Sequence, residues 1–503
     1  MLQATRTIQE HECKWRIAST DDYVRFMEQA RQLGADVSEP RSVAIHDVYL
    51  DTEDGYFHLA GARCRLRSMD DRWELTFKAS RKADNNIFRR MEKTFALPGV
   101  GSESEAMEYC QREILLPIVK GRSVVSLFSL SNRREIRELV FADGIRVESG
   151  FDEVEMRYLN RSVAGRELEL ELLSGNEEDF SDLVTQLTHL VSLQPNDKSK
   201  YDQALEVFGL AAEAYGNRAY QFDGDSSIEE AARAIVRRDL QMIRDSEPGV
   251  RVGIYHDAIH DMRVACRRVR TALRIFKAQL PERAHKTAEE VAWLGRVLGR
   301  GRDLEVQIAT LKNTAWLLAD QDRTNLHPYW ERLSDRFQGE RREIMQALDS
   351  PRYTQLLLVL ENIALSIPEE GDQNRHTGRA GARIIGQVIK GIFAKYPRRT
   401  VPQEMTDRSL HKLRIEMKRI RYLCEFFSHV SSAGIDSYIQ KTKVLQKILG
   451  DHQDLVTGNE MVRAEGRQAA DPALRDSLAK LATKLREGKV TQQRLFRDVW
   501  RNF

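Results

Sequence analysis

The sequence has no long apolar run, few cysteines and no apolar leader segment. No stretch approaches the roughly 20 apolar residues that span a bilayer, which argues against a helical membrane anchor. The five cysteines are scattered without a C-x-x-C pair, so reduced thiols are expected in place of a disulfide framework or a zinc site. The first residues also lack the apolar core of a secretory signal. Together these absences predict a cytoplasmic protein.

Residues 1–225 also lack the familiar signatures of covalent or nucleotide-dependent catalysis. They contain no Gly-x-Ser-x-Gly elbow, no Walker A loop and no convincing Cys/His pair. Chemistry in this half is therefore not expected to use a covalent nucleophile.

Charge divides the chain into two unlike halves. Residues 1–225 contain 29 Lys and Arg against 40 Asp and Glu, whereas residues 226–503 contain 49 against 36. A chain of 503 residues exceeds what one core usually organises, so we predict a first domain over residues 1–208, a linker over 209–227 and a second domain over 228–503. The basic second half predicts a polyanionic partner, with mutual attraction of the two halves as the plainer alternative.

Charged and apolar residues alternate in five segments of the first half, as expected for strands with one charged face. The charged or polar positions are Glu10, Glu12 and Lys14; Arg63, Arg65 and Arg67; Glu74, Thr76 and Lys78; Arg146 and Glu148; and Glu167, Glu169 and Glu171. Because the charges are sorted strand by strand, we predict an α+β domain whose antiparallel sheet surrounds a charged lumen. Amphipathic segments at residues 21–33 and 180–191 are predicted as covering helices, the first opened by a Thr20/Asp21 cap.

The two kinds of charged strand indicate a chemistry. Clustered carboxylates suit hard divalent cations such as Mg²⁺ or Mn²⁺, and facing Arg and Lys side chains suit the oxygens of a phosphate chain. The pattern therefore predicts metal-assisted phosphoryl transfer.

An ordered set of motifs over residues 8–205 resembles the CYTH superfamily, the triphosphate tunnel metalloenzymes. The set consists of Glu10-x-Glu12-x-Lys14, Tyr49-Leu-Asp51-Thr52, GARCRLR at Gly61 to Arg67, Leu75-Thr-Phe-Lys78, Arg90-x-Glu92, Glu167-Leu-Glu-Leu-Glu171 and Ser199-Lys200-Tyr201. The resemblance implies an eight-stranded antiparallel tunnel that hydrolyses triphosphate compounds or, in some members, cyclises ATP.

The resemblance also implies roles for individual residues. Metal ligands would be Glu10, Glu12, Glu169 and Glu171, with Lys14 joining Glu10 and Glu12 in the catalytic set. Phosphate contacts would be Arg65, Arg67, Lys78, Arg90, Lys200 and Arg134. Arg134, Glu148 and Asp152 align less firmly with the family's site residues. The family often has a further acidic residue where this chain has Thr94, so a second metal site or turnover is expected to be impaired.

The second half contains an internal repeat and the composition of an all-α domain. His260-Asp-Met-Arg263-x3-Arg267-Arg268-x-Arg270 matches His411-Lys-Leu-Arg414-x3-Lys418-Arg419-x-Arg421 at a shift of 151 positions. Leu298-Gly299 and Asp303-Leu304 meet Leu449-Gly450 and Asp454-Leu455 at the same shift. The repeat predicts two pseudo-symmetric helical bundles.

Each copy carries one basic stripe, because its His, Arg and Lys positions fall on a single helix face. The stripes consist of His260, Arg263, Arg267 and Arg270, and of His411, Arg414, Lys418 and Arg421. A stripe present twice favours anion binding over a merely solubilising face. The histidines have no metal-ligand spacing around them.

Both helices and both Leu-Gly-x-x-x-Asp segments resemble the CHAD domain, a histidine-containing helical domain often fused to CYTH. The resemblance implies that the two stripes bind inorganic polyphosphate. Association with polyphosphate granules in the cytoplasm is an open alternative for its location. The copies differ where Arg300, Gly301 and Arg302 become Asp451, His452 and Gln453, so unequal binding is expected.

The leading interpretation is a metal-dependent inorganic triphosphatase, similar to bacterial CYTH-CHAD enzymes, whose helical domain retains polyphosphate. A polyphosphate-binding scaffold without turnover is the main alternative. RNA or DNA is disfavoured as a partner because the stripes lack interleaved aromatic residues for base stacking. Adenylate cyclase activity is a minor alternative, and the oligomeric state is left open.

Overall fold

The computed structural model describes most of the chain in two compact units. Residues 6–59, 61–70, 72–82, 88–142, 144–191, 193–210, 220–253, 257–277, 279–366, 406–430 and 435–501 are described, with a few isolated residues between 383 and 394. One unit comprises Met1–Gly216 and Arg244–Ala258, and the other comprises Asn217–Ile243 and Ile259–Phe503.

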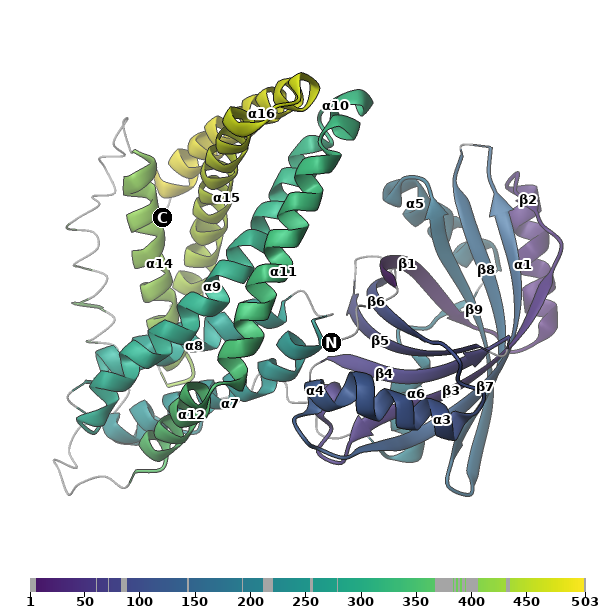
Figure 1. Cartoon of the computed structure of the whole chain (residues 1–503), viewed down its shortest axis with the longest axis horizontal. Helices are drawn as coiled ribbons and strands as arrows, with labels where there is room; N and C mark the ends of the chain where they lie inside the picture. The colour runs from purple at the N-terminus through teal and green to yellow at the C-terminus, as the bar shows by residue number, and fades with distance from the viewer. Residues whose placement is uncertain are drawn as a thin grey trace. The chain divides into compact units, whose positions relative to one another are not determined.

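The first unit is built on an antiparallel sheet (Figure 1). Its strands are β1 (Arg6–Arg16), β2 (Asp36–Val37), β3 (Arg41–Thr52), β4 (Ala62–Met69), β5 (Arg72–Lys82), β6 (Phe88–Leu97), β7 (Val124–Val140), β8 (Arg146–Tyr158), β9 (Arg161–Ser174) and β10 (Gln194–Pro195). Eight of them follow the order β1-β6-β5-β4-β3-β7-β8-β9, and β9 pairs back with β1. The short β2 and β10 attach to β7 and β1. The predicted eight-stranded tunnel is confirmed.

Helices cover the outer apolar face of the sheet on two sides (Figure 1). The elements of this unit are α1 (Thr20–Gln32), α2 (Tyr56–Leu59), α3 (Glu103–Tyr109), a π-helix η2 (Cys110–Leu115), α4 (Leu116–Val119), α5 (Glu177–Val191) and α6 (Lys200–Phe208). Helices α1 and α5 pack on the outer side chains of β1, β8 and β9, and α3, η2 and α4 pack on those of β4, β5 and β6. The two predicted helices are confirmed, but the predicted cap is wrong. Ser19 caps α1 in a capping box with Asp22, because its side chain reaches the free amide of the first turn.

The second unit is all-helical, as predicted. Its helices are α7 (Ile228–Val252), which ends in the first unit, α8 (Ala258–Ile275), α9 (Arg283–Ala315), α10 (Asp320–Asn325), α11 (His327–Asp349), α12 (Pro351–Ala364), α14 (Asp407–Phe427), α15 (Ile435–Gln468) and α16 (Pro472–Arg501). At a shift of 151 positions α8 matches α14, α9 matches α15, and α10 with α11 matches α16. The duplication read from the sequence is therefore also a duplication of helices.

Within the described parts of the chain, no helix is both long enough and apolar enough to cross a membrane. All five cysteines are described, buried and free of disulfide bonds. Burial raises the pKa of the Cys266 thiol to about 12, which keeps this thiol protonated and unreactive.

Candidate functional site

The charged residues of β1 and β9 lie on one inner face of the sheet. Paired residues of neighbouring strands project to the same side, and the register places Glu12 opposite Glu171 and Lys14 opposite Glu169. Glu10, Glu12 and Lys14 are only 8%, 5% and 4% exposed. The alternation in the sequence therefore separates a charged lumen from the apolar outer core.

Three carboxylates from β8 and β9, here called the triad, form a tightly paired group in the lumen: Asp152, Glu167 and Glu169. One oxygen atom of each lies within 4.8 Å of the others. Lys200 Nζ lies 2.9 Å from Asp152 Oδ2, 2.7 Å from Glu167 Oε2 and 2.7 Å from Glu169 Oε1. Arg134 Nε and Nη2 donate to the two oxygens of Asp152 at 2.7 Å. Arg134 and Lys14 each also pair with Glu169.

Side-chain amides add further hydrogen bonds to the triad. Asn132 Nδ2 donates to Asp152 Oδ1 at 2.7 Å, while Asn196 Nδ2 and Gln203 Nε2 donate to Glu167 Oε1 at 2.5 and 2.6 Å. Burial alone would favour the neutral acids, yet the contacting cations hold the pKa of Glu169 well below its ordinary value and also lower that of Asp152. Both of these acids are therefore ionised at neutral pH.

A second group of carboxylates, here called the glutamate cluster, is less completely neutralised: Glu10, Glu12, Glu148 and Glu171. In the strand register, Glu12 and Glu148 both lie opposite Glu171. Lys78 Nζ lies 3.2 Å from Glu10 Oε2, and burial nevertheless raises the pKa of Glu10. Burial, reinforced by Glu10 and Glu12, raises the pKa of Glu171 to about 7. The cluster therefore carries an excess of negative charge, the condition that favours a divalent cation.

Cationic side chains of β4 and β5 line the lumen beside these carboxylates. Arg67 Nε and Nη2 donate to Asp47 Oδ1 and Oδ2 at 2.7 and 2.8 Å, and Arg65 Nη1 lies 3.6 Å from Asp47 Oδ2. Although Asp47 is buried, Arg67 and Arg65 hold its pKa at about 2. Lys78 pairs with Glu92 as well as with the glutamate cluster. Asp47 thus holds two guanidinium groups side by side, an arrangement that suits adjacent phosphate oxygens.

The lumen also contains carboxylates to which the sequence analysis gave no role: Asp47, Glu92 and Glu167. Glu92 and Glu167 belong to the motifs named above and lie on the same strand faces as residues that were given roles. The alternation of side chains along a strand was therefore enough to place them in the lumen. Asp47 was detectable as the lone acid in the mostly apolar stretch from Val43 to Leu50 of β3. Arg90 lies opposite Glu10 in β6, but its side chain is outside the described residues. Thr94 is buried and donates to Glu92 Oε1 at 3.1 Å.

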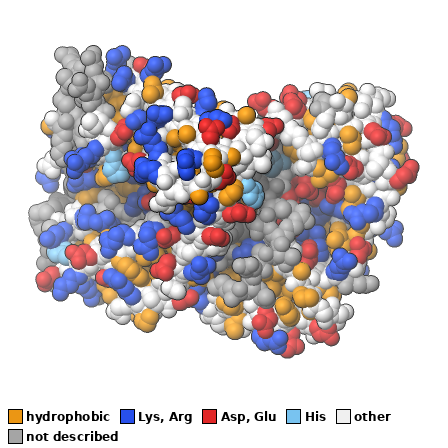
Figure 2. All heavy atoms as spheres, turned by 45° about the horizontal axis from the view of Figure 1, so that its top comes forward, with side chains coloured by type: hydrophobic (Ala, Val, Ile, Leu, Met, Phe, Trp, Pro, Cys, Tyr) orange, Lys and Arg blue, Asp and Glu red, His pale blue; other side chains and the backbone are white. Residues whose placement is uncertain are grey.

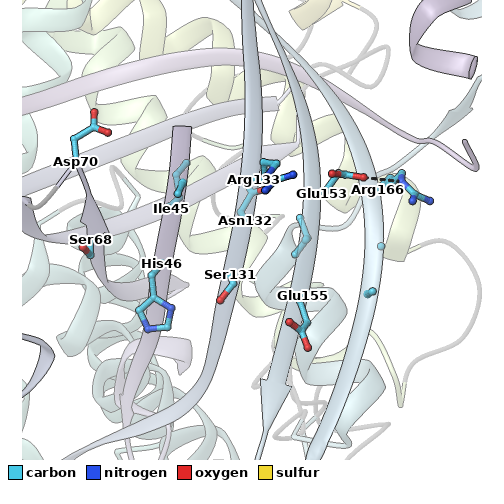
Figure 3. A pocket seen from close by; sticks show the side chains of 14 residues that line it. Ile45, His46, Ser68, Asp70, Ser131, Asn132, Arg133, Glu153, Glu155 and Arg166 are labelled. Carbon is cyan, nitrogen blue, oxygen red and sulfur yellow. Dashed lines mark hydrogen bonds and ion pairs between the residues drawn. The ribbon is translucent and has the colours of Figure 1, made fainter. Parts of the chain in front are cut away.

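A hollow lies mainly on the outer face of β3, β7, β8 and β9, and its lining also includes Asn132, which donates to Asp152 in the lumen (Figure 3). Arg133, Glu153 and Glu155 alternate along their strands with the lumen residues Asn132 and Asp152, so they project outward. Glu153 and Arg166 form an ion pair of 3.3 Å across it. None of the residues that line the hollow belongs to the predicted site.

In the helical unit, α8 and α14 bring the two predicted basic stripes together. The rings of Phe276 and Phe427, equivalent positions of the repeat, have centroids 6.1 Å apart, and Arg268 of α8 pairs with Glu425 of α14. Burial lowers the pKa of Arg267, and the guanidinium groups of both stripes lower it further. Lys and Arg side chains are frequent over the helical part of the face drawn in Figure 2.

Lys418 of α14 is affected by the positive charges of both stripes. Burial, reinforced by four neighbouring guanidinium groups, lowers the pKa of the Lys418 ammonium to about 6. The four groups belong to Arg267, Arg414, Arg263 and Arg421. Positive charges that are concentrated in a partly desolvated surface repel one another, and a bound anion reduces this repulsion.

Several stripe residues also have polar partners or buried surroundings of their own. Arg263 Nη1 donates to Asp303 Oδ1 at 2.6 Å, Arg421 Nε lies 3.4 Å from Glu425 Oε1, and His411 Nδ1 is 2.9 Å from Gln453 Oε1. Burial lowers the pKa of Arg270, with Arg274 and Arg296 adding to the effect. His260 is half-buried on α8. The structure therefore places all eight predicted residues on α8 and α14.

The fold and these sites define a two-domain class of protein, with a charged β-tunnel followed by a duplicated helical domain. Residues 9–204 match the family model of the CYTH domain, and residues 234–463 match that of the CHAD domain. The chain therefore carries a CYTH domain and a CHAD domain in tandem. The resemblance drawn from its motifs is confirmed.

Known proteins are similar to parts of the chain. Two uncharacterized proteins from different strains of Mycobacterium tuberculosis are each 33% identical over 250 residues, which is 47% of this chain and 46% of theirs. The chain thus spans about half the length of the curated relatives it matches. The CHAD domain of the plant Ricinus communis is 26% identical, with 58% of this chain and 98% of that chain covered and a TM-score of 0.46. The RNA triphosphatase domain of a mimivirus mRNA capping enzyme is 12% identical, with 37% and 89% covered and a TM-score of 0.24.

Proposed function

We propose that the tunnel hydrolyses inorganic triphosphate or short-chain polyphosphate with the aid of Mg²⁺ or Mn²⁺. The observation that carries this proposal is the under-neutralised glutamate cluster lying beside a row of Arg and Lys side chains in one buried lumen. Carboxylate oxygens are the ligands that hard divalent cations prefer, and paired guanidinium groups match phosphate oxygens.

The glutamate cluster fits such a cation better than the triad does. Glu10, Glu12 and Glu171 would hold it, because burial and their mutual repulsion raise the pKa of Glu171 and a dication would relieve that repulsion. Glu169, the fourth predicted ligand, already contacts Lys14, Arg134 and Lys200. Its role as a ligand remains a proposal that requires one of these ion pairs to open.

The chain's own residues would bind and orient the phosphate. Arg65, Arg67, Lys78 and Arg90 would hold its oxygens, and Lys14 would face the phosphate or the attacking water. The bound cation would supply Lewis-acid polarisation of the phosphoryl oxygens. Water would then add to the terminal phosphorus while the bridging P–O bond breaks, which releases orthophosphate and leaves pyrophosphate from triphosphate.

The test is release of orthophosphate from tripolyphosphate by the purified full-length chain with Mg²⁺ or Mn²⁺, and with EDTA. Release only in the presence of the cation is expected. Release that needs no divalent cation would contradict the metal-assisted mechanism. Tight polyphosphate binding without release would select the scaffold, to which the replacement of an acid by Thr94 points, and cyclic AMP formed from ATP would select a cyclase.

For the helical domain we propose polyphosphate binding by the combined stripes of α8 and α14. The carrying observation is that cations of both copies converge on Lys418. Competition between polyphosphate and single-stranded RNA tests the choice of polyanion. RNA displacing polyphosphate at equal phosphate concentration would contradict the proposal.

Polyphosphate affinity is expected to fall as the pH rises above about 6. Lys418, with its pKa lowered to about 6, is neutral in the free protein above that pH, so binding an anion must take up a proton. Burial, together with Asp451 and Asp303, raises the pKa of nearby Asp454 to about 6, and its ionisation changes the affinity in the same direction. Each proton changes the affinity by at most about tenfold per pH unit.

Polyphosphate titrations between pH 5 and 8 at constant ionic strength check this dependence. Lys418→Arg is expected to reduce the slope and Lys418→Arg/Asp454→Asn to remove it. An equally steep slope in the double variant would show that other groups are responsible.

A further inference from the structure

The ammonium of Lys200 lies among the three carboxylates of the triad. Its Nζ lies within 2.9 Å of an oxygen atom of each of Asp152, Glu167 and Glu169. The triad also has the geometry of a cation site, because one oxygen from each residue lies within 4.8 Å of the others. Lys200 is itself only 10% exposed at its side chain.

Cationic side chains already surround the triad. Lys200 forms an ion pair with each of its three carboxylates. Arg134 pairs with Asp152 and Glu169, and Lys14 pairs with Glu169 while also lying 3.6 Å from Glu12 of the glutamate cluster. A buried divalent ion added to this group would add to the positive charge that already faces the carboxylates.

The backbone around Lys200 positions its side chain at the triad. Lys200 is the first residue of α6, and the preceding Ser199 forms a capping box with Asp202. Asp202 is in turn held by Arg63 Nη2, which donates to its two oxygens at 3.0 and 3.2 Å. Asn196 precedes the helix, and its backbone N–H donates to the backbone carbonyl of Lys14 at 2.9 Å. The helix start is therefore anchored on several sides.

We infer that Lys200 is a tethered cation that takes the place of a second divalent ion, so that the tunnel binds one metal ion, at the glutamate cluster. Lys200 Nζ donates hydrogen bonds to Asp152 and Glu169 and forms an ion pair with Glu167, so its ammonium already faces three carboxylates. In this arrangement Lys200 acts on a phosphate through its charge. Thr94, which offers a hydroxyl to Glu92 in place of a carboxylate, adds no ligand for a second ion.

This inference deepens the proposed function and rests on a divalent cation being used in the tunnel. It is tested by counting bound Mn²⁺ in the purified full-length chain, from the loss of the free-ion signal in electron paramagnetic resonance. The wild type is expected to take up one Mn²⁺ tightly, and Glu10→Gln/Glu12→Gln none. Lys200→Met is expected to take up a second ion, because the triad then lacks one of its cations.

The matched control is Lys198→Met, two residues away, which removes an exposed lysine paired with Glu206 at 2.6 Å and should leave one ion bound. Two tight ions in the wild type, or one remaining in Glu10→Gln/Glu12→Gln, would overturn the inference, whether or not Lys200→Met folds. A folded Lys200→Met that still binds one ion would also overturn it. One bound ion without phosphate release would reject the proposed hydrolysis alone, and release with two bound ions would reject the inference alone.

Discussion

Replacing Glu10 and Glu12 together by Gln is expected to reduce metal-dependent phosphate release by at least about a thousandfold. Such a loss corresponds to about 4 kcal/mol of transition-state stabilisation, which is within the range supplied by a bound metal ion. The amides keep the shape of the carboxylates but remove two negative charges from the glutamate cluster. Because Glu10 and Glu12 both help to raise the pKa of Glu171, that pKa should fall in the variant.

The measurement is orthophosphate release from tripolyphosphate at saturating Mg²⁺ or Mn²⁺. Glu155→Gln is the matched control, since Glu155 is an exposed residue of β8 that pairs with Arg157 at 2.7 Å. It should retain wild-type turnover. Wild-type turnover in Glu10→Gln/Glu12→Gln would show that the cluster does not serve catalysis.

Replacing Arg267 and Arg414 together by Gln is expected to weaken polyphosphate binding about a hundredfold or more, without loss of thermal stability. Each charge-assisted hydrogen bond to a phosphate contributes about 1.5–3 kcal/mol, and two are removed. Stability should be kept or increased, because both guanidinium groups contribute to the repulsion that lowers the pKa of Lys418. A residue kept only for packing would show the opposite effect on stability.

Polyphosphate titration and thermal unfolding of the same samples check this pair of effects. The control is Arg332→Gln/Arg352→Gln, which removes two exposed arginines of the same unit that pair with Glu465 and Glu290. The control should bind almost as the wild type does, at the same ionic strength. Equal losses of affinity in both double variants would indicate general charge attraction and not a specific surface.

Strand parity made the lumen predictable from the sequence. The charged strand faces that contain Glu10, Arg65 and Glu169 could be predicted from the two-residue period of a strand and from the sorting of charge strand by strand. Parity says which face a side chain occupies, but not which acid meets which cation. The triad has more cationic partners than the glutamate cluster because Lys200, on a helix 31 residues beyond Glu169, pairs with the triad.

The helical half was predictable for a different reason. A repeat of 151 positions transfers the helix boundaries of one copy to the other, so α8 and α14 follow from one another. The contact between equivalent phenylalanines was not predictable, since a repeat does not state how its copies meet. The cap of α1 was misplaced by one residue, because Ser19, Thr20 and Asp21 all belong to the residue types that cap helices.

The pairing of β1 with β9 sets the order in which the lumen assembles during synthesis. Glu12, on β1, meets Glu171 on a strand made about 160 residues later. At roughly 5–20 residues per second, β1 waits on the order of ten seconds or more for that partner. During this interval its edge toward β9 exposes unpaired backbone groups, which makes it a ready template for other strands. Chaperone dependence of the nascent chain should therefore end when β9 emerges.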